Sequence, residues 1–309
     1  MEMPVPNAFK TSVAETRSVS VLGSTGSIGR NTLDLIARYP ETFSVVALTG
    51  NNNTQLLAEQ AKLFDPELVV VASKEKYREL KRELGGTKIR VEAGLESLVE
   101  AASLDAALVM AGIVGIAGLE PTIAAVRRGA TVALANKECL VCAGDLLLGE
   151  LKQNQGTLIP VDSEHNAIFQ VFDFQQRESV RSLILTASGG PFREMPVDKM
   201  ALVTPKEALA HPNWEMGAKV SVDSATMMNK GLELIEAFYL FPVQEEQISI
   251  LVHPQSVVHS MVTYVDGSVL AQLGSPDMRI PISYALAWPK RLETPAPQLD
   301  LGLLSCLTF

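Results

Sequence analysis

The stretch SVSVLGSTGSIG (residues 18–29), followed by RNTLDLI (30–36), decides the fold. A β-branched run, three glycines spaced by three and a helical pattern are typical of the first strand, turn and helix of a dinucleotide-binding fold. Amide groups at the start of such a helix hold a pyrophosphate, and glycine lets the ligand approach the backbone closely. Because the spacing is G-x-x-G-x-x-G rather than G-x-G-x-x-G, the prediction depends on the position between strand and helix more than on the motif.

Outward from this turn, short apolar runs alternate with helical patterns. Such alternation predicts an α/β domain with a parallel, doubly wound, Rossmann-like sheet that helices cover on both faces. Gly129 is placed to end the helix before the sixth run. We expect strands at residues 18–22, 44–49, 67–72, 88–92, 106–111, 131–135 and 157–161.

The second half of the chain changes rhythm, which predicts an α+β domain. The run RSLILTA (181–187) is one expected strand. The runs ISILV (248–252) and MVTYVDGSVLAQL (261–273) are interpreted as an antiparallel meander, with a hairpin turn at Asp266-Gly267.

One long helix and one long loop complete this half. The helix is expected over residues 224–240, with Ser224 as its N-cap. The loop, residues 189–217, is rich in proline and has little periodicity, which is typical of a lid. The expected parts of the chain are an N-terminal extension at 1–17, a dinucleotide-binding domain at 18–161, a catalytic domain at 162–287 with its flap at 189–217, and a linker at 288–309.

The composition excludes some classes of partner. A formal net charge of −9 disfavours nucleic acid and anionic membranes, since proteins that hold phosphate backbones need clustered cations. The longest uncharged apolar run, residues 106–119, is shorter than the ~20 residues that span a bilayer. Three cysteines give no disulfide framework, which favours a reducing compartment, with the cytoplasm as the expected location.

Three acids are the candidate metal ligands. Asp162 and Glu164 follow the expected strand at 157–161, where residues two apart project to the same side. Two converging carboxylates repel each other unless a hard divalent cation, such as Mg²⁺ or Mn²⁺, lies between them. Glu233 is the natural third ligand, because it lies four residues after Asn229 and so on the same helix face.

Anion-binding side chains surround Glu233 in the sequence SVDSATMMNKGLE. Ser224, Asn229 and Lys230 fall within two turns of it, and these residue types bind phosphate. Ser188, in TASGGPF, offers a hydroxyl and neighbouring N–H groups to the same anion. The histidines interpreted as core or capping residues rather than ligands are His165, His253 and His259.

Two loops carry further candidates. Residues 50–53, at the end of the second expected strand, read GNNN, where an NAD site would have a carboxylate. Amides donate hydrogen bonds to a 2′-phosphate that a carboxylate would repel, so the sequence favours NADP. His211 and Trp214 lie in the expected flap, where a large ring is suited to covering a ligand.

Eight motifs resemble, in order, those of the 1-deoxy-D-xylulose 5-phosphate reductoisomerase family, and the resemblance runs from Ser18 to about Leu307. The motifs are GSTGSIG, ALANKE, PVDSEHNA, TASGGPF, HPNWEMG, SVDSATMMNKGLE, HPQSVVHSMV and AQLGSPDMR. The family commonly has a basic or small residue in place of Asn51. Its members also continue into a C-terminal helical domain that is expected to be missing from this chain.

The resemblance implies an NADPH-dependent homodimer that uses Mn²⁺, Mg²⁺ or Co²⁺. The implied cofactor contacts are Thr25, Gly26, Ser27, Ile28, Gly50, Asn51, Asn52, Asn136, Glu138 and Gly217. The implied catalytic residues are Lys137 and the metal ligands Asp162, Glu164 and Glu233. The implied substrate contacts are Lys137, Ser163, Glu164, Ser188, His211, Trp214, Met216, Ser224, Asn229, Lys230 and Glu233.

The implied reaction converts 1-deoxy-D-xylulose 5-phosphate into 2-C-methyl-D-erythritol 4-phosphate, in the non-mevalonate isoprenoid pathway. A metal that chelates adjacent carbonyl and hydroxyl oxygens suits such a carbon–carbon rearrangement, and NADPH then reduces the resulting aldehyde. Two alternatives stay open: a simple NADP-dependent dehydrogenase of a phosphorylated sugar or semialdehyde, and a non-catalytic NADPH-sensing module. Turnover without metal would favour the dehydrogenase.

Overall fold

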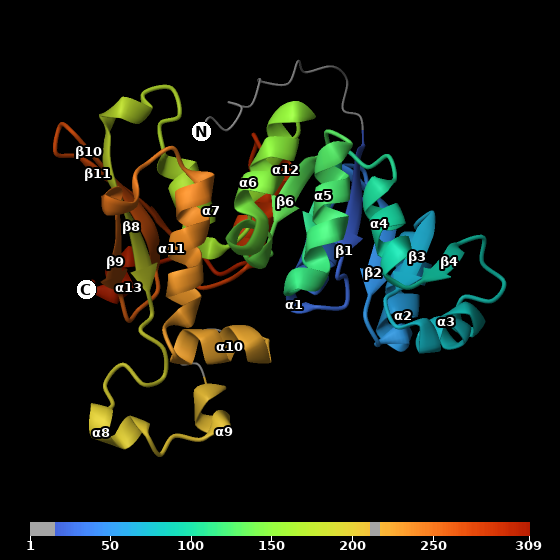
Figure 1. Cartoon of the computed structure of the whole chain (residues 1–309), viewed down its shortest axis with the longest axis horizontal. Helices are drawn as coiled ribbons and strands as arrows, with labels where there is room; N and C mark the ends of the chain where they lie inside the picture. The colour runs from blue at the N-terminus through green and yellow to red at the C-terminus, as the bar shows by residue number, and fades with distance from the viewer. Residues whose placement is uncertain (1–15, 211–216) are drawn as a thin grey trace. The chain divides into compact units, whose positions relative to one another are not determined.

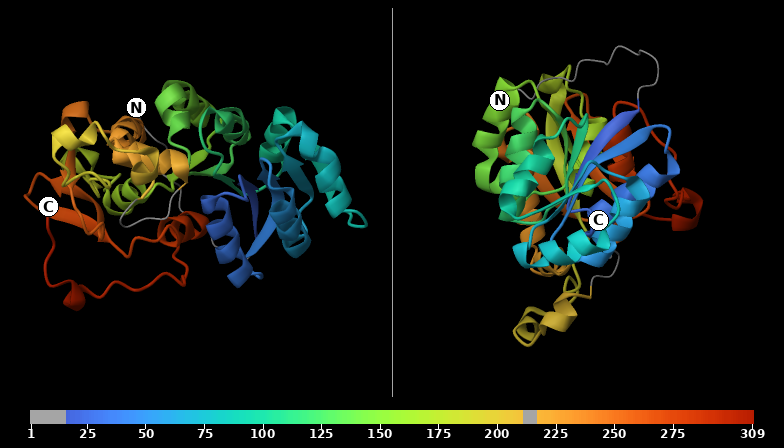
Figure 2. Two further views of the ribbon diagram at one scale, coloured as in Figure 1. Left: turned by 90° about the horizontal axis from the view of Figure 1, so that it is seen from below. Right: turned by 90° about the vertical axis from the view of Figure 1, so that its right-hand side faces the viewer.

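The computed structural model describes residues 16–210 and 217–309. The chain divides into two compact units, which are described one at a time. The first unit runs to Asp162 and takes in Ile282–Thr294, and the second comprises Ser163–Pro281 and Pro295–Phe309. Each unit is built on a sheet with helices beside it (Figures 1 and 2). The glycine-rich turn belongs to the first unit, and Glu164 and Glu233 belong to the second.

The sheet of the first unit is parallel, as the alternating pattern predicts. Its strand order is β4-β3-β2-β1-β5-β6-β7, so β1 pairs with β2 on one side and with β5 on the other. All residues of β3 and β5 are buried, which requires cover on both faces of the sheet. The strands are β1 (Arg17–Leu22), β2 (Phe43–Gly50), β3 (Leu68–Val71), β4 (Arg90–Ala93), β5 (Leu108–Ala111), β6 (Thr131–Leu134) and β7 (Thr157–Pro160).

Helices connect these strands, and local signals set their ends. Gly129, at φ 74°, follows α5 and takes the left-handed conformation that glycine adopts without strain, so the prediction that it ends this helix is confirmed. Asn53 caps α2, because its side chain accepts a hydrogen bond from the Leu56 amide at 3.1 Å. The helices are α1 (Ser27–Arg38), α2 (Thr54–Phe64), η1 (Lys74–Lys76), α3 (Tyr77–Glu83), α4 (Leu95–Ser103), η2 (Ile116–Gly118), α5 (Leu119–Arg127) and α6 (Glu138–Gln153).

The sheet of the second unit is mixed and has the order β11-β10-β8-β9. The predicted hairpin at Asp266-Gly267 is confirmed, since β10 and β11 are antiparallel and Gly267 has φ 88°. The meander is wrong at its first strand: β9 pairs with β8 in parallel, and β10 lies on the other side of β8. A parallel partner needs a long crossover, which residues 188–247 supply. The strands are β8 (Val180–Ala187), β9 (Ile248–Val252), β10 (Val258–Tyr264) and β11 (Val269–Leu273).

The long helix predicted over residues 224–240 is two helices. Ser224 lies in the last turn of α10 rather than at an N-cap, and α11 begins at Met228. The chain breaks at Met227, which has φ 61° and is therefore left-handed. No glycine or proline marks this break in the sequence. The helices of this unit include α7 (Ser163–Val171), η3 (Arg177–Ser179), α8 (Val197–Met200), α9 (Pro205–Ala208), α10 (Ala218–Ala225), α11 (Met228–Leu240), η4 (Glu245–Gln247) and α13 (Leu301–Leu304), and α12 (Arg279–Ala287) passes from it into the first unit.

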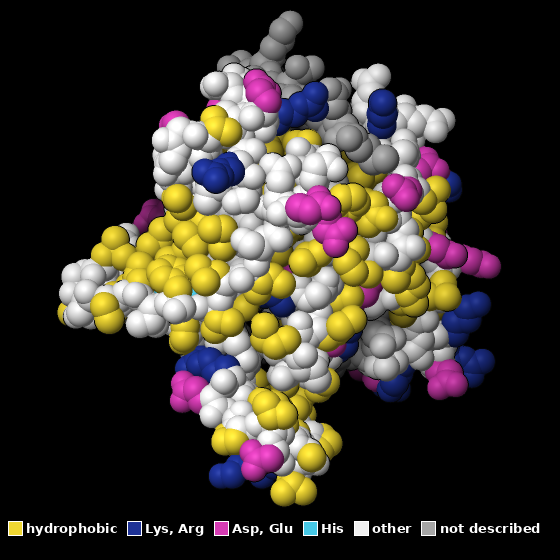
Figure 3. Space-filling model, turned by 60° about the vertical axis from the view of Figure 1, so that its left-hand side comes forward, with side chains coloured by type: hydrophobic (Ala, Val, Ile, Leu, Met, Phe, Trp, Pro, Cys, Tyr) yellow, Lys and Arg dark blue, Asp and Glu magenta, His cyan; other side chains and the backbone are white. Residues whose placement is uncertain are grey.

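Two surface properties of the described residues bear on partners. No helix among them has both the length and the apolar character needed to cross a membrane. Apolar side chains gather on the side of the molecule turned forward in Figure 3, where the four-stranded sheet lies. On the outer strands of that sheet Ile250 is 41% exposed, Val269 51% and Leu270 48%, so apolar side chains at both edges of the sheet are uncovered.

Candidate active site

The glycine-rich turn joins β1 to α1. Gly23 has φ 82°, and a Cβ there would lie 2.8 Å from the Gly112 carbonyl oxygen. A Cβ on Gly29 would lie 2.4 Å from the Gly23 carbonyl oxygen, so this glycine allows the turn to pack on its own helix. Gly26 is the N-cap of α1, and both Gly26 and Ser27 are exposed. The turn thus presents an open helix N-terminus, which fits a pyrophosphate.

The turn after β2 lies against the glycine-rich turn. A Cβ on Gly50 would lie 3.2 Å from Thr25 Cγ2, so the structure brings these two predicted cofactor residues together. Asn51 and Asn52 are exposed beyond the end of the strand. Two uncharged amides next to an open helix N-terminus fit the adenosine end of a dinucleotide.

Three predicted residues follow β6 in the sequence ANKE. Asn136 is buried, and its amide group donates a 2.8 Å hydrogen bond to the Gly115 carbonyl oxygen, which holds the loop after β5. Lys137 Nζ lies 3.0 Å from Asp162 Oδ2. Glu138 is the first residue of α6. The carboxyl ends of β5, β6 and β7 therefore carry these side chains at one edge of the sheet, where ligands of open α/β sheets bind.

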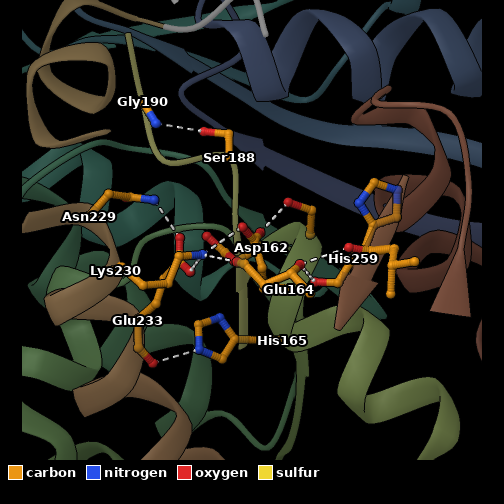
Figure 4. A network of polar contacts seen from close by, with 12 residues as sticks. Asp162, Glu164, His165, Ser188, Gly190, Asn229, Lys230, Glu233 and His259 are labelled. Atoms are coloured by element: carbon orange, nitrogen blue, oxygen red, sulfur yellow. Dashed lines mark hydrogen bonds and ion pairs between the residues drawn. The ribbon is translucent and has the colours of Figure 1, made fainter. Parts of the chain in front are cut away.

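In the second unit, α7 and α11 bring three charged side chains together, and we call Glu164, Lys230 and Glu233 the ion cluster. Lys230 Nζ donates to Glu164 Oε1 at 2.8 Å and also to a Glu233 carboxylate oxygen (Figure 4). A third bond joins Lys230 Nζ to the Thr186 carbonyl oxygen of β8 at 2.5 Å. Lys230 and Glu233 are only 4% and 1% exposed, so these charges are almost fully removed from water.

Burial and charge act on Lys230 in opposite directions. Burial alone would lower its pKa, but the carboxylates of Glu164 and Glu233 raise that pKa above its ordinary value. Lys230 is therefore an ammonium ion at neutral pH. An ammonium between two carboxylates compensates part of their negative charge in a site that is largely removed from water.

The three predicted metal ligands come together. Asp162 lies two residues before Glu164, where the first unit gives way to the second. One carboxylate oxygen from each of Asp162, Glu164 and Glu233 lies within 4.8 Å of the other two. The local geometry differs from the prediction, because Glu164 is on α7 and does not extend the strand. Three converging oxygen donors fit a hard divalent cation such as Mg²⁺ or Mn²⁺.

The predicted phosphate ligands lie at two neighbouring places. Gly190 N–H donates to Ser188 Oγ at 3.2 Å, and a Cβ on Gly190 would lie 2.6 Å from the Ser224 carbonyl oxygen, so this loop packs on the end of α10. Asn229 donates to Glu233 Oε1, and Ser163 on α7, a predicted substrate contact, donates to Glu164.

Gly217, a predicted cofactor contact, is the exposed N-cap of α10. The predicted residues that lie outside the described part of the chain are His211, Trp214 and Met216.

The prediction that His165, His253 and His259 are core residues is confirmed by their burial. The sequence did not predict what His165 does there. One ring nitrogen lies 2.8 Å from the Glu233 carbonyl oxygen, and the other lies 3.3 Å from Glu236 Oε2. His165 thus ties α7 to α11 directly behind two of the metal-ligand candidates. The available signal was spacing: His165 follows Glu164, and Glu236 lies one helical turn after Glu233.

Comparisons with known proteins agree with this geometry. Three family models match in order: 1-deoxy-D-xylulose 5-phosphate reductoisomerase at residues 19–144, its C-terminal domain at 158–241, and a DXP reductoisomerase C-terminal domain at 273–309. The reductoisomerase of Rhodospirillum centenum is 62% identical over 293 residues, which are 95% of this chain and 73% of that protein. The Zymomonas mobilis enzyme is 56% identical, over 96% of this chain and 76% of that protein.

Solved structures give the same result. The Zymomonas mobilis reductoisomerase in complex with NADPH has a TM-score of 0.90 and 55% identity, over 95% of this chain and 76% of that one. A reductoisomerase in complex with NADPH, fosmidomycin and magnesium has a TM-score of 0.91 and 45% identity, over 94% of this chain and 74% of that one. Matches of this extent and identity establish kinship, and the chain belongs to the 1-deoxy-D-xylulose 5-phosphate reductoisomerase family.

Proposed function

We propose that this chain catalyses the NADPH- and divalent-metal-dependent rearrangement and reduction of 1-deoxy-D-xylulose 5-phosphate to 2-C-methyl-D-erythritol 4-phosphate. The observation that carries the proposal is the convergence of carboxylate oxygens from Asp162, Glu164 and Glu233. Water stabilises the charge of an acid on the surface. Glu233 is only 1% exposed, so its carboxylate needs a compensating positive charge inside the protein. Relatives with NADPH and magnesium bound support the same assignment.

Each group of residues has a separate task in this proposal. The glycine-rich turn and the Gly50–Asn52 turn hold NADPH, together with Asn136, Glu138 and Gly217. When bound, the metal supplies a positive charge that polarises the substrate's carbonyl and hydroxyl oxygens, and NADPH supplies the hydride. Asp162, Glu164 and Glu233 hold the metal and fix its position.

Other side chains orient the substrate. Ser188, Ser224, Asn229 and Lys230, with His211, bind the phosphate end. Binding energy from this remote group positions the reacting carbons. Lys137 and Ser163 contact the substrate's hydroxyls, and Trp214 and Met216 close the flap at 189–217 over it. The domain limits that we propose are those expected from the sequence.

The assay that tests the proposal follows NADPH absorbance with 1-deoxy-D-xylulose 5-phosphate in the presence of Mn²⁺ or a chelator. We expect NADPH loss only with metal, and a branched product identified by NMR. Equal turnover with the chelator would favour a simple dehydrogenase of a phosphorylated sugar or semialdehyde. NADPH binding without turnover in Mn²⁺ would favour a sensing module.

We also propose a homodimer, located in the cytoplasm and without a nucleic-acid partner. The exposed apolar side chains on the outer strands of the four-stranded sheet, including Val269 and Leu270, support self-association, since large exposed apolar patches mark interfaces. Cys139, Cys142 and Cys306 form no disulfide among the described residues, which supports a reducing compartment. Sedimentation at micromolar concentration should give a dimer, and a monomer there would contradict this part of the proposal.

A further inference from the structure

Gln60, on α2, is a buried amide that contacts the glycine-rich turn. It is 8% exposed, and its partner Ser24 is fully buried. The Ser24 hydroxyl donates to Gln60 Oε1 at 2.7 Å, and Gln60 Nε2 donates back to the Ser24 carbonyl oxygen at 2.9 Å. The Ser24 N–H donates to the Thr49 carbonyl oxygen at 2.7 Å. The hydroxyl, carbonyl and N–H groups of Ser24 are therefore all held by β2 and α2.

The residues on either side of Ser24 are held from the same direction. The Gly23 N–H donates to Thr49 Oγ1 at 2.9 Å. The Thr25 side chain packs against Gly50. The first half of the turn is thus fixed by the protein interior, while Gly26 and Ser27 remain exposed at the helix N-terminus.

This arrangement affects how tightly the turn can bind a ligand. A loop that must be ordered when its ligand arrives loses affinity, because ordering costs conformational entropy. A turn already held by buried hydrogen bonds avoids that cost. Gln60 and Ser24 have neutral side chains, and both are buried, so their effect on a phosphate ligand is conformational rather than electrostatic.

We propose that Gln60 is a positioning residue: its paired hydrogen bonds to Ser24 hold the glycine-rich turn in the conformation that binds the pyrophosphate of NADPH. The inference rests on the proposed function. It assigns to Gln60 an effect on the Kd and KM for NADPH, with no effect on kcat at saturating NADPH or on the KM for the sugar phosphate. A residue that only stabilises α2 would not produce this split.

The test compares single and double variants by calorimetric titration with NADPH. Gln60→Met keeps the length of the side chain but removes both hydrogen bonds, which leaves the buried hydroxyl and carbonyl groups of Ser24 without these partners. The turn is then held less firmly, and the Kd for NADPH should rise about tenfold. Ser24→Ala keeps the amide-to-carbonyl bond and should raise the Kd about threefold. The double variant should match Gln60→Met, because both changes act on one pair.

Lys62→Gly is the matched control. Lys62 is exposed on the same helix, and glycine lowers helix stability without touching the turn, so the melting temperature should fall while the Kd for NADPH stays constant. Gln60→Met with wild-type affinity would overturn the inference, as would an equal loss of affinity in Lys62→Gly. Wild-type protein that binds no NADPH would instead overturn the proposed function, and this inference with it.

Discussion

The glycine-rich turn and the ion cluster are built by opposite means. The turn is held by neutral groups, through the hydrogen bonds of Ser24 with Gln60 and Thr49. The ion cluster is held by full charges, since Lys230 pairs with both Glu164 and Glu233. A neutral network is satisfied before any ligand arrives. A buried cluster that contains more carboxylates than cations gains further stabilisation from an added positive charge.

The two regions should therefore respond differently to substitution. In the turn, shape is decisive, so a change acts through backbone geometry and cofactor affinity. In the ion cluster, charge is decisive, so a substitution of the same shape should still remove function. Substitutions at Glu233, Lys230 and Gly29 test this contrast, and a fourth at His259 tests stability in acid. Their expected effects on turnover at neutral pH decrease in that order.

Glu233→Gln should give the largest effect, a loss of turnover of about a thousandfold or more, while NADPH affinity stays unchanged. The amide keeps the shape of the side chain but removes the negative charge that a divalent cation requires. Steady-state kinetics across a range of Mn²⁺ concentrations, with calorimetry for NADPH, measure both quantities. Normal metal-dependent turnover would refute the ligand assignment and remove the contrast between the two regions.

Lys230→Met should reduce turnover about a hundredfold, because the two carboxylates lose their fixed cation and the proposed phosphate site loses a donor. Without metal the variant should melt well below the wild type, since the buried Glu233 and the partly buried Glu164 then lack compensation. Mn²⁺ should raise its melting temperature more than it raises that of the wild type. An equal response to Mn²⁺ in both proteins would show that Lys230 and the metal do not act on the same charges.

Local patterns explain why much of the first unit could be predicted. The strands β3, β5 and β6 are almost wholly apolar runs. The glycine-rich turn lies between a strand and a helix that are each recognisable from their own pattern. The ion cluster could be predicted in part for the same reason, because Lys230 and Glu233 lie one helical turn apart. Asp162 and Glu164 were predicted from their place after the strand at 157–161, and the motifs that resemble a family point to the same residues.

The features that the sequence missed depend on contacts between distant segments. Nothing local specifies that β9 should pair with β8 in parallel rather than with β10, because strand order is set by packing of the whole unit. The break at Met227 is a left-handed residue of a type that ordinarily continues a helix. The contact of His165 with Glu236 joins residues on two different helices, so only the folded chain brings them together.

Gly29→Ala tests the other side of the contrast, because it changes shape and no charge. Its Cβ would lie 2.4 Å from both the Gly23 carbonyl oxygen and Ser24 Cα, so the backbone of the turn must shift. We expect NADPH affinity to fall about thirtyfold, with kcat largely kept at saturating NADPH, since the ion cluster is untouched. Calorimetry and KM values for both substrates measure this. A loss of kcat with unchanged KM for NADPH would contradict the assignment of the turn to the cofactor.

His259, on β10, should have the smallest effect on turnover at neutral pH and a clear effect on stability in acid. Burial is the largest cause that lowers the pKa of His259, and the nearby His253 also lowers it. Backbone hydrogen bonds with Ser275 and Gly274 act in the opposite direction, and the resulting pKa is about 4 instead of the ordinary 6.5. Between these pH values the unfolded chain binds a proton that the folded chain does not, so folding stability falls as pH drops from about 6.5 towards 4. The shift corresponds to about 3 kcal/mol. Urea midpoints should therefore fall less steeply over this range in His259→Gln than in the wild type, and parallel curves would show that His259 does not set the acid limit.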